Sequence, residues 1–166
     1  MSKPISKLTA SLVSTARKVN WSHQVYATTR LVRFHEMEYN IPLENFEPAL
    51  KAILDCVNHN DFKIYFPIET RVVKGDDAYL SPAYGRDSVY ISCHVYNKKS
   101  YEKYFHAAEA IFLAHGGRPH WGKQHFLKAA DLRQRYPKFD AFVKHRQEQD
   151  PQGLFLNDYL KELFVD

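Results

Sequence analysis

The most informative stretch of this sequence is Gly116-Gly117-Arg118-Pro119-His120-Trp121-Gly122-Lys123. A helical pattern runs into the glycine pair, which predicts that a helix ends at Gly116 or Gly117. Pro119 and Gly122 then predict a turn that presents two cations, an imidazole and an indole close together. A plain connection needs polar, flexible residues and little else. Two interpretations follow: a rigid loop whose Trp121 fills the core, or one wall of a binding site.

The segments on either side predict an α+β fold. Alternating β-branched and aromatic residues predict strands over about 30–39 (ending at Pro42), 62–73 and 88–96. Apolar stripes at helical spacing predict helices from Asn45, as N-cap, to about 59, and over 99–115. The order β-α-β-β-α favours an antiparallel sheet with helices packed on one face.

A helical C-terminal tail is expected after the glycine-rich turn. Its predicted helices span about 129–135, 137–149 and 157–164, the last with Asn157 as its cap. A further short amphipathic helix is predicted over 6–18 near the N-terminus. We therefore expect a helical N-terminal extension over 1–27 and one main domain over 28–166.

Composition excludes several classes of protein. The 166 residues contain 45% hydrophobic and 25% charged side chains, as in an ordinary soluble domain. The net charge of +4 is spread along the chain, so no defined nucleic-acid site is expected. Cys56 and Cys93 lie in apolar segments without the spacing of a metal site, which favours reduced thiols, no metal and a cytoplasmic location. No apolar run reaches the length of a signal peptide or membrane span.

The face of the sheet away from the helices is the candidate functional surface. Residues two apart on a strand share a face, so Glu69 lies beside Arg71, and His94 beside Tyr96. Antiparallel pairing of the two strands would gather all four into one polar cluster. The alternative is a solvated surface with a weak ion pair.

Three ordered motifs carry a resemblance to a known family. They are Gly117-Arg118-Pro119-His120-Trp121-Gly122-Lys123, Arg33-Phe34-His35-Glu36-Met37-Glu38-Tyr39-Asn40-Ile41-Pro42, and Tyr136-Pro137-Lys138-Phe139-Asp140 with Asp150-Pro151-Gln152-Gly153-Leu154-Phe155-Leu156-Asn157. From about Thr28 onward, the chain resembles the C-terminal domain of the D-arabinono-1,4-lactone oxidase and alditol oxidase family. These are FAD-linked enzymes of the vanillyl-alcohol-oxidase superfamily.

The resemblance implies a set of site residues. It assigns Lys123, Arg71, His94 and Glu69 to catalysis. It assigns Tyr96, His120 and Arg118 to the substrate, and Lys123 with Trp121 to the flavin. Loop packing is the alternative function of His120 and Trp121. Tyr96 replaces the small hydroxyl residue of bacterial alditol oxidases, which favours an aldonolactone over a linear alditol. The strand residues Glu36 and Glu38 are left without an assigned face.

The chemistry of such an enzyme requires residues of these types. Hydride transfer from a carbinol carbon to flavin requires the hydroxyl proton to leave and negative charge to be stabilised. Lys123 and Arg71 would supply positive charge, Glu69 would hold Arg71, and His94 would accept or relay the proton.

The six glycines form no dinucleotide fingerprint, so we expect the FAD-binding domain to be supplied in cis or in trans. An isolated chain would then be inactive. An exposed pocket would favour self-association, and membrane association is expected only in the full-length family. The alternatives are a truncated, non-catalytic module that binds sugar or nucleic acid. Salt-dependent retention on a nucleic-acid column would identify the latter.

Overall fold

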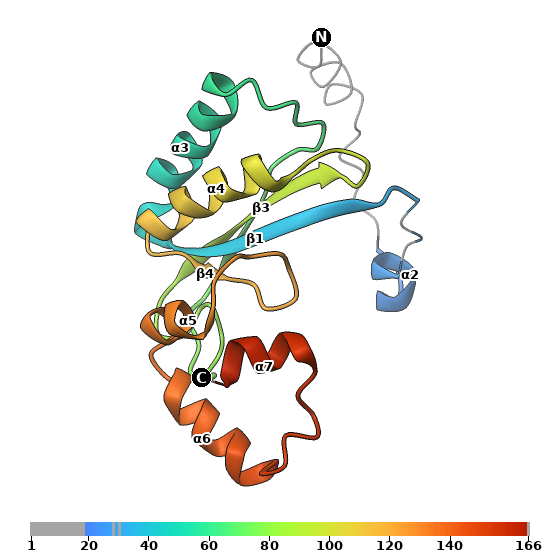
Figure 1. Cartoon of the computed structure of the whole chain (residues 1–166). Coiled ribbons are helices and arrows are strands. Elements are labelled where there is room, and N and C mark those ends of the chain that lie inside the picture. Colours follow the sequence, from blue (N-terminus) through green and yellow to red (C-terminus); the bar gives the residue numbers. More distant parts are fainter. Residues whose placement is uncertain (1–18, 28, 30, 166) are drawn as a thin grey trace.

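The computed structural model describes residues 19–27, 29 and 31–165 and contains a four-stranded sheet (Figure 1). The strands are β1 (Phe34–Pro42), β2 (Glu69–Val73), β3 (Ser88–Tyr96) and β4 (Arg118–Pro119). They lie in the order β2-β3-β1-β4, and every neighbouring pair is antiparallel. The predicted α+β class is confirmed.

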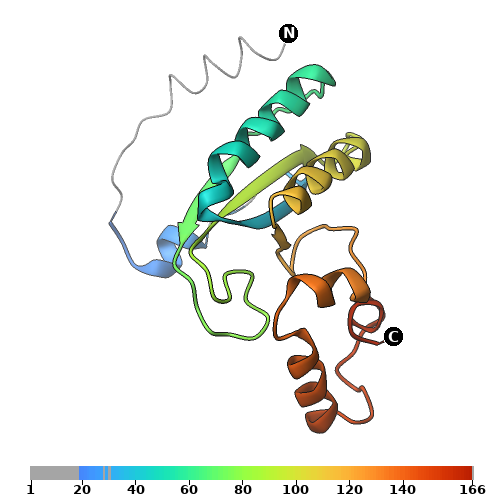
Figure 2. The ribbon, with the colours of Figure 1, turned by 90° about the vertical axis from the view of Figure 1, so that its left-hand side faces the viewer.

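Two helices cover one face of this sheet. α3 (Phe46–His59) and α4 (Glu102–Ala114) lie side by side on it (Figures 1 and 2). Beneath them, alternate residues of β1 and β3 are buried: Met37, Tyr39, Ile41, Val89, Ile91, Cys93 and Val95. The Tyr39 ring stacks on Phe112 of α4 at 5.1 Å between ring centroids. The opposite face of the sheet is left to polar residues, because side chains alternate along a strand.

The C-terminal helices form a second apolar cluster beyond β4. They are α5 (Ala129–Arg135), α6 (Phe139–Gln149) and α7 (Asp158–Phe164), at the bottom of Figure 1. Asn157 Oδ1 accepts a hydrogen bond from Leu160 N at 2.8 Å, which confirms the predicted cap. Trp121 packs against this cluster, so the glycine-rich turn joins the two cores.

The turn after α4 closes as its glycines predict. Gly116 adopts φ +75°, and Gly117 N donates to Phe112 O at 2.8 Å, which satisfies carbonyls at the helix end. One expectation was incomplete. Arg118 and Pro119 are more than a turn, because they pair with Asn40 and Tyr39 as the edge strand β4.

Two further expectations differ from the structure. The strand predicted over 62–73 is formed only from Glu69, since Pro67 lacks the N–H that a ladder requires. Asn45 does not cap α3 with its side chain. After the short 3₁₀-helix η1 (Leu43–Asn45), its amide donates to His115 O at 3.2 Å and ties α3 to the end of α4.

The N-terminal region is described only in part. The helix predicted over 6–18 lies outside the described residues. A short helix, α2 (Ser22–Tyr26), forms where the pattern predicted no regular structure. In the part of the chain that the structure describes, no helix is long and apolar enough to cross a membrane.

Candidate functional site

The polar face of the sheet gathers acidic and basic side chains from three strands. The register places Glu36 of β1 opposite His94 of β3, and Glu38 opposite Ser92. On the far side of β3, Glu69 of β2 also pairs with Ser92, and Arg71 pairs with Tyr90. The site is therefore set by strand pairing between distant segments of the chain.

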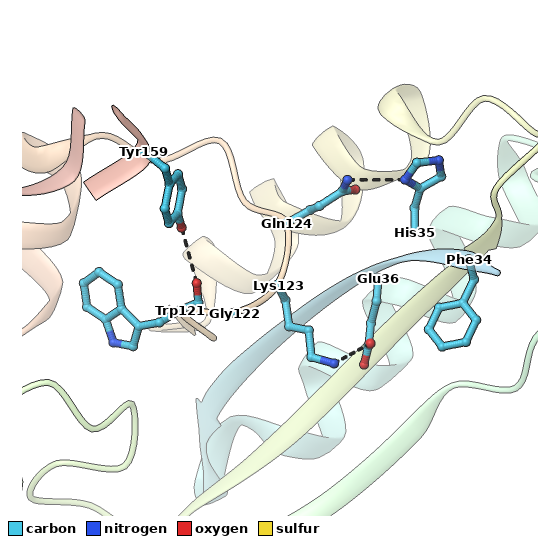
Figure 3. A pocket seen from close by; sticks show the side chains of 8 residues that line it. All are labelled: Phe34, His35, Glu36, Trp121, Gly122, Lys123, Gln124 and Tyr159. Carbon is cyan, nitrogen blue, oxygen red and sulfur yellow. Dashed lines mark hydrogen bonds and ion pairs between the residues drawn. The ribbon is translucent and has the colours of Figure 1, made fainter. Parts of the chain in front are cut away.

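Glu36 is the centre of the first charged group. Its carboxylate accepts from Lys123 Nζ through Oε2 (Figure 3). Its other oxygen, Oε1, lies 3.4 Å from His94 Nε2. The loop that carries Lys123 runs along β1 and is held by main-chain bonds, His120 N to Glu38 O at 2.9 Å and Gln124 N to Glu36 O at 3.0 Å. The ammonium is thus aimed at the sheet face by the backbone of the glycine-rich turn.

Glu38 forms the second charged group with Arg71. The Arg71 guanidinium donates to Glu38 Oε1 and lies over the Tyr90 ring at 5.7 Å. This hydrogen bond is the main cause that raises the pKa of Arg71. The Glu38 side chain is fully buried, whereas that of Arg71 is 60% exposed. Among the described residues, Glu38 Oε2 has no hydrogen-bond partner.

His94 lies between the carboxylate of Glu36 and two aromatic rings. Its ring centroid is 5.0 Å from that of Phe34 and 5.8 Å from that of Phe66. The side chain is 5% exposed. Nδ1 is buried without a partner in the described part of the chain, so only the Nε2 side of the imidazole meets the polar face.

The structure brings Lys123, His94 and Arg71 onto one face of the sheet. The carboxylates that hold them there are Glu36 and Glu38, which had no predicted face. Arg71 does not bond to Glu69 as expected. Its hydrogen-bond partner is Glu38, although the charge of the exposed Glu69 also contributes to the raised pKa of Arg71. The alternation of side chains along β1 could have placed Glu36 and Glu38 on this face. Met37, Tyr39 and Ile41 face the helices, so the residues between them must face away.

Tyr96 lies at the end of β3, away from the paired charges. It lines a separate recess of about 320 Å³ with Val32, Tyr65, Phe66 and Lys99. Among the residues described, it forms no bond with the Lys123 or Arg71 group.

The side chains of Arg118 and Trp121 both donate hydrogen bonds to main-chain oxygens. Arg118 is 8% exposed and donates to the backbone oxygens of Pro82, Tyr84 and Arg135. The Arg118 guanidinium is buried against main-chain carbonyls and clamps the β2–β3 connection, and substrate binding by Arg118 stays a prediction. Trp121 Nε1 donates to Leu80 O at 2.8 Å. Its ring stacks on Phe164 of α7.

His120 lies at the border of the site. Its Nδ1 accepts from Gly122 N at 3.0 Å, which fixes the turn before Lys123. The ring approaches Tyr90 edge-on at 6.3 Å. His120 thus shapes the loop and also adjoins the aromatic ring over which Arg71 lies.

A recess of about 500 Å³ opens beside the Lys123–Glu36 pair (Figure 3). Its walls come from the start of β1, the turn and α7: Phe34, His35, Glu36, Trp121, Gly122, Lys123, Gln124 and Tyr159. The recess and the polar face therefore share one ion pair.

Fold and site together define an α+β domain whose open sheet face pairs two cations with two carboxylates. The chain belongs to the D-arabinono-1,4-lactone oxidase family, whose pattern matches residues 1–163. It is 45% identical over 159 residues to an L-gulono-1,4-lactone dehydrogenase of Mycobacterium tuberculosis, covering 96% of this chain and 37% of that protein.

Two further relatives match a smaller part of this chain. The L-gulonolactone oxidase of Scyliorhinus torazame is 36% identical, covering 90% of this chain and 35% of the relative. An alditol oxidase of a Streptomyces species is 33% identical, covering 77% and 31%. The chain thus spans about a third of the length of these curated relatives.

Proposed function

We propose that this chain is the substrate-side domain of an FAD-dependent oxidoreductase that oxidises a CH–OH group of an aldonolactone or alditol. The names of its relatives support this reaction class. The observation that carries the proposal is the row of side chains on the open face, where Glu36 lies between Lys123 and His94, and Arg71 pairs with Glu38 beside them.

The residues present fit one end of a flavin. Lys123 uses one ammonium N–H on Glu36 and retains others, and Arg71 is largely exposed, so both are free to meet a polar ring edge or a substrate oxygen. Gly75 and Gly117 serve the packing of the chain itself. A Cβ at Gly75 would meet the backbone of Arg86 at 2.9 Å, and one at Gly117 would meet Phe112 O at 2.6 Å. The pyrophosphate end would therefore be held by a separate domain.

The chain's own residues would bind the substrate and stabilise charge. When bound, FAD would supply the acceptor for the hydride equivalent removed from carbon. Lys123 and Arg71 would donate hydrogen bonds to the substrate oxygen, and the Glu36 carboxylate, beside Lys123 and His94, would accept the proton that this oxygen loses. His94 would contact the same oxygen. Glu69, at the exposed rim, would accept from a substrate hydroxyl.

A lactone is favoured over a linear alditol by the names of the two more similar relatives, an L-gulono-1,4-lactone dehydrogenase and an L-gulonolactone oxidase. Tyr96 lies in a recess separate from the one beside Lys123 and does not decide between the two substrates. A nucleic-acid function has less support, because Glu36 and Glu38 occupy the middle of the sheet face and would repel phosphates.

Co-expression with the remaining N-terminal part of the mycobacterial relative tests the proposal. We expect no lactone oxidation by the purified chain alone. In the assembled protein we expect flavin absorbance and dye-coupled oxidation of L-gulono-1,4-lactone. Lys123→Met should reduce kcat by about a hundredfold or more, whereas Lys51→Met, on the exposed side of α3, should not. Turnover by the chain alone, or an unaffected Lys123→Met protein, would overturn the proposal.

A further inference from the structure

The recess beside Lys123 has the chemistry of a site for a neutral, hydroxylated ligand. Among the described residues that line it, Lys123 is the only lysine or arginine and is already paired with Glu36, so the recess offers no net charge to attract an anion or a cation. The remaining wall combines the rings of Phe34 and Tyr159 with the polar amide of Gln124. Apolar rings beside donors and acceptors suit the C–H and O–H groups of a polyol.

Tyr159 supplies the polar group on the outer wall. Its hydroxyl lies 2.9 Å from His125 Nε2 and donates to Trp121 O at 3.3 Å. Partial burial raises the pKa of Tyr159, so the hydroxyl stays neutral and retains a lone pair for another partner. Figure 3 shows it on the side of the recess opposite Phe34.

The inner wall offers both donors and acceptors. Lys123 retains ammonium N–H groups beyond the one on Glu36, and the Glu36 carboxylate has further lone pairs. Gln124 Nε2 lies 3.3 Å from His35 Nδ1, whereas Gln124 Oε1 is buried and is therefore not among the groups offered to a ligand. A ligand in the recess would therefore meet hydrogen-bonding groups on both sides.

We propose that this recess binds the exocyclic, hydroxyl-bearing tail of a sugar lactone whose ring contacts Lys123, and that Tyr159 selects for the longer tail. The placement of the ring rests on the proposed function. The volume of about 500 Å³ is in the range of small-molecule sites and exceeds the need of a lactone ring alone. Because Lys123 and Glu36 form a wall of the recess and also lie on the sheet face, one ligand can reach both.

The test is a binding titration of the full chain followed by the backbone amide signals in NMR. L-Gulono-1,4-lactone carries a two-carbon tail and D-arabinono-1,4-lactone a one-carbon tail. We expect both to shift Gly122 and Gln124 saturably, and the longer lactone to bind about threefold or more tightly. Tyr159→Phe should remove this difference. Tyr79→Phe, at an exposed tyrosine outside the recess, should preserve it.

Two results would overturn the subsite: equal affinity of the two lactones for the unsubstituted chain, or no saturable shift at Gly122 and Gln124. The first comparison needs no variant, so it does not depend on how Tyr159→Phe folds. Failure of the proposed function is seen separately. If the assembled protein oxidises neither lactone while the longer one still binds more tightly to the recess, the subsite stands and the proposed reaction falls.

Discussion

Glu36 Oε1 lies 3.4 Å from His94 Nε2, directly across the β1–β3 pair. The same carboxylate holds Lys123 through its other oxygen. One side chain therefore fixes an imidazole from a neighbouring strand and an ammonium from a loop that is 87 residues away in sequence. The position of Lys123 depends on Glu36 as much as on the turn that carries it.

Glu36→Gln should release Lys123 and lower stability. Both side chains are less than one third exposed, 17% for Glu36 and 28% for Lys123, so their attraction is only partly screened by water. We expect a loss of about 1–2 kcal/mol in the free energy of unfolding, measured in urea. Asp55→Asn breaks the exposed Lys51–Asp55 pair and should cost less than about 0.5 kcal/mol. Equal losses in the two variants would contradict this view of the pair.

His94 should carry its proton on Nε2 in the neutral imidazole. A lone pair on Nε2 would face the Glu36 carboxylate, and an N–H at Nδ1 would be a buried donor without a partner, a rarer state than an unpaired acceptor. Imidazole ¹⁵N chemical shifts report the tautomer directly. We expect an N–H type signal from Nε2 and a lone-pair type signal from Nδ1. Glu36→Gln should weaken this preference, and the opposite assignment would contradict this view of the contact between His94 and Glu36.

Gly117→Ala should be one of the more damaging single substitutions in the chain. The added methyl would lie 2.6 Å from Phe112 O and 3.0 Å from Tyr39 Cδ1, against rigid groups that close α4 onto the sheet. We expect a loss above about 2 kcal/mol by urea unfolding followed by circular dichroism. Gly85→Ala is the matched control, since φ is +70° there but no atom lies within 4 Å of the added methyl. It should cost only the backbone strain of about 1 kcal/mol.

Cys93 should make the fold sensitive to alkaline pH. Burial raises the pKa of its thiol to about 12, whereas an unfolded thiol titrates near ~8.5. The unfolded chain therefore loses this proton at a lower pH than the folded chain. The contribution of the protonated thiol to stability is complete below pH ~8.5 and is lost as the pH rises from there toward about 12. The slope reaches ~1.4 kcal/mol per pH unit at most.

Urea titrations between roughly pH 8.5 and 10, below the range in which unfolded tyrosine ionises, isolate the thiol. Burial also raises the pKa of Tyr39, Tyr104 and Tyr136, which contribute only at higher pH. Cys93→Ala should flatten the slope in this window, and Cys56→Ala should leave it unchanged. An unaltered slope in Cys93→Ala would mean that another group is responsible.

Local patterns predicted the elements that depend on local chemistry. The alternation of β3, the glycine at the end of α4 and the Asn157 cap depend on residues a few positions apart, and all three are confirmed. The Asn45 cap is wrong for a long-range reason. The amide of Asn45 reaches His115, 70 residues away, and no local pattern contains that partner.

The site was predictable in its cations and not in their carboxylates. Glu69 is two residues from Arg71 and was the nearest acid in sequence. Arg71 instead meets Glu38, 33 residues away, because β1 and β2 flank β3 in the sheet. Strand order and register are set by the packing of the whole domain. The motif around Lys123 identified a loop that reaches the polar face of the sheet, yet the acid that receives its ammonium is fixed by the same long-range pairing.

The clamp on the β2–β3 connection has a consequence for how this family can diverge. Arg118 and Trp121 donate to the main-chain oxygens of Leu80, Pro82 and Tyr84 in that connection. Every amino acid offers the same carbonyl, so the side chains at Pro82 and Tyr84 can change while these hydrogen bonds are retained, whereas the Leu80 side chain also packs on the C-terminal cluster. Relatives can thus vary the surface of this connection without changing the turn that carries Trp121.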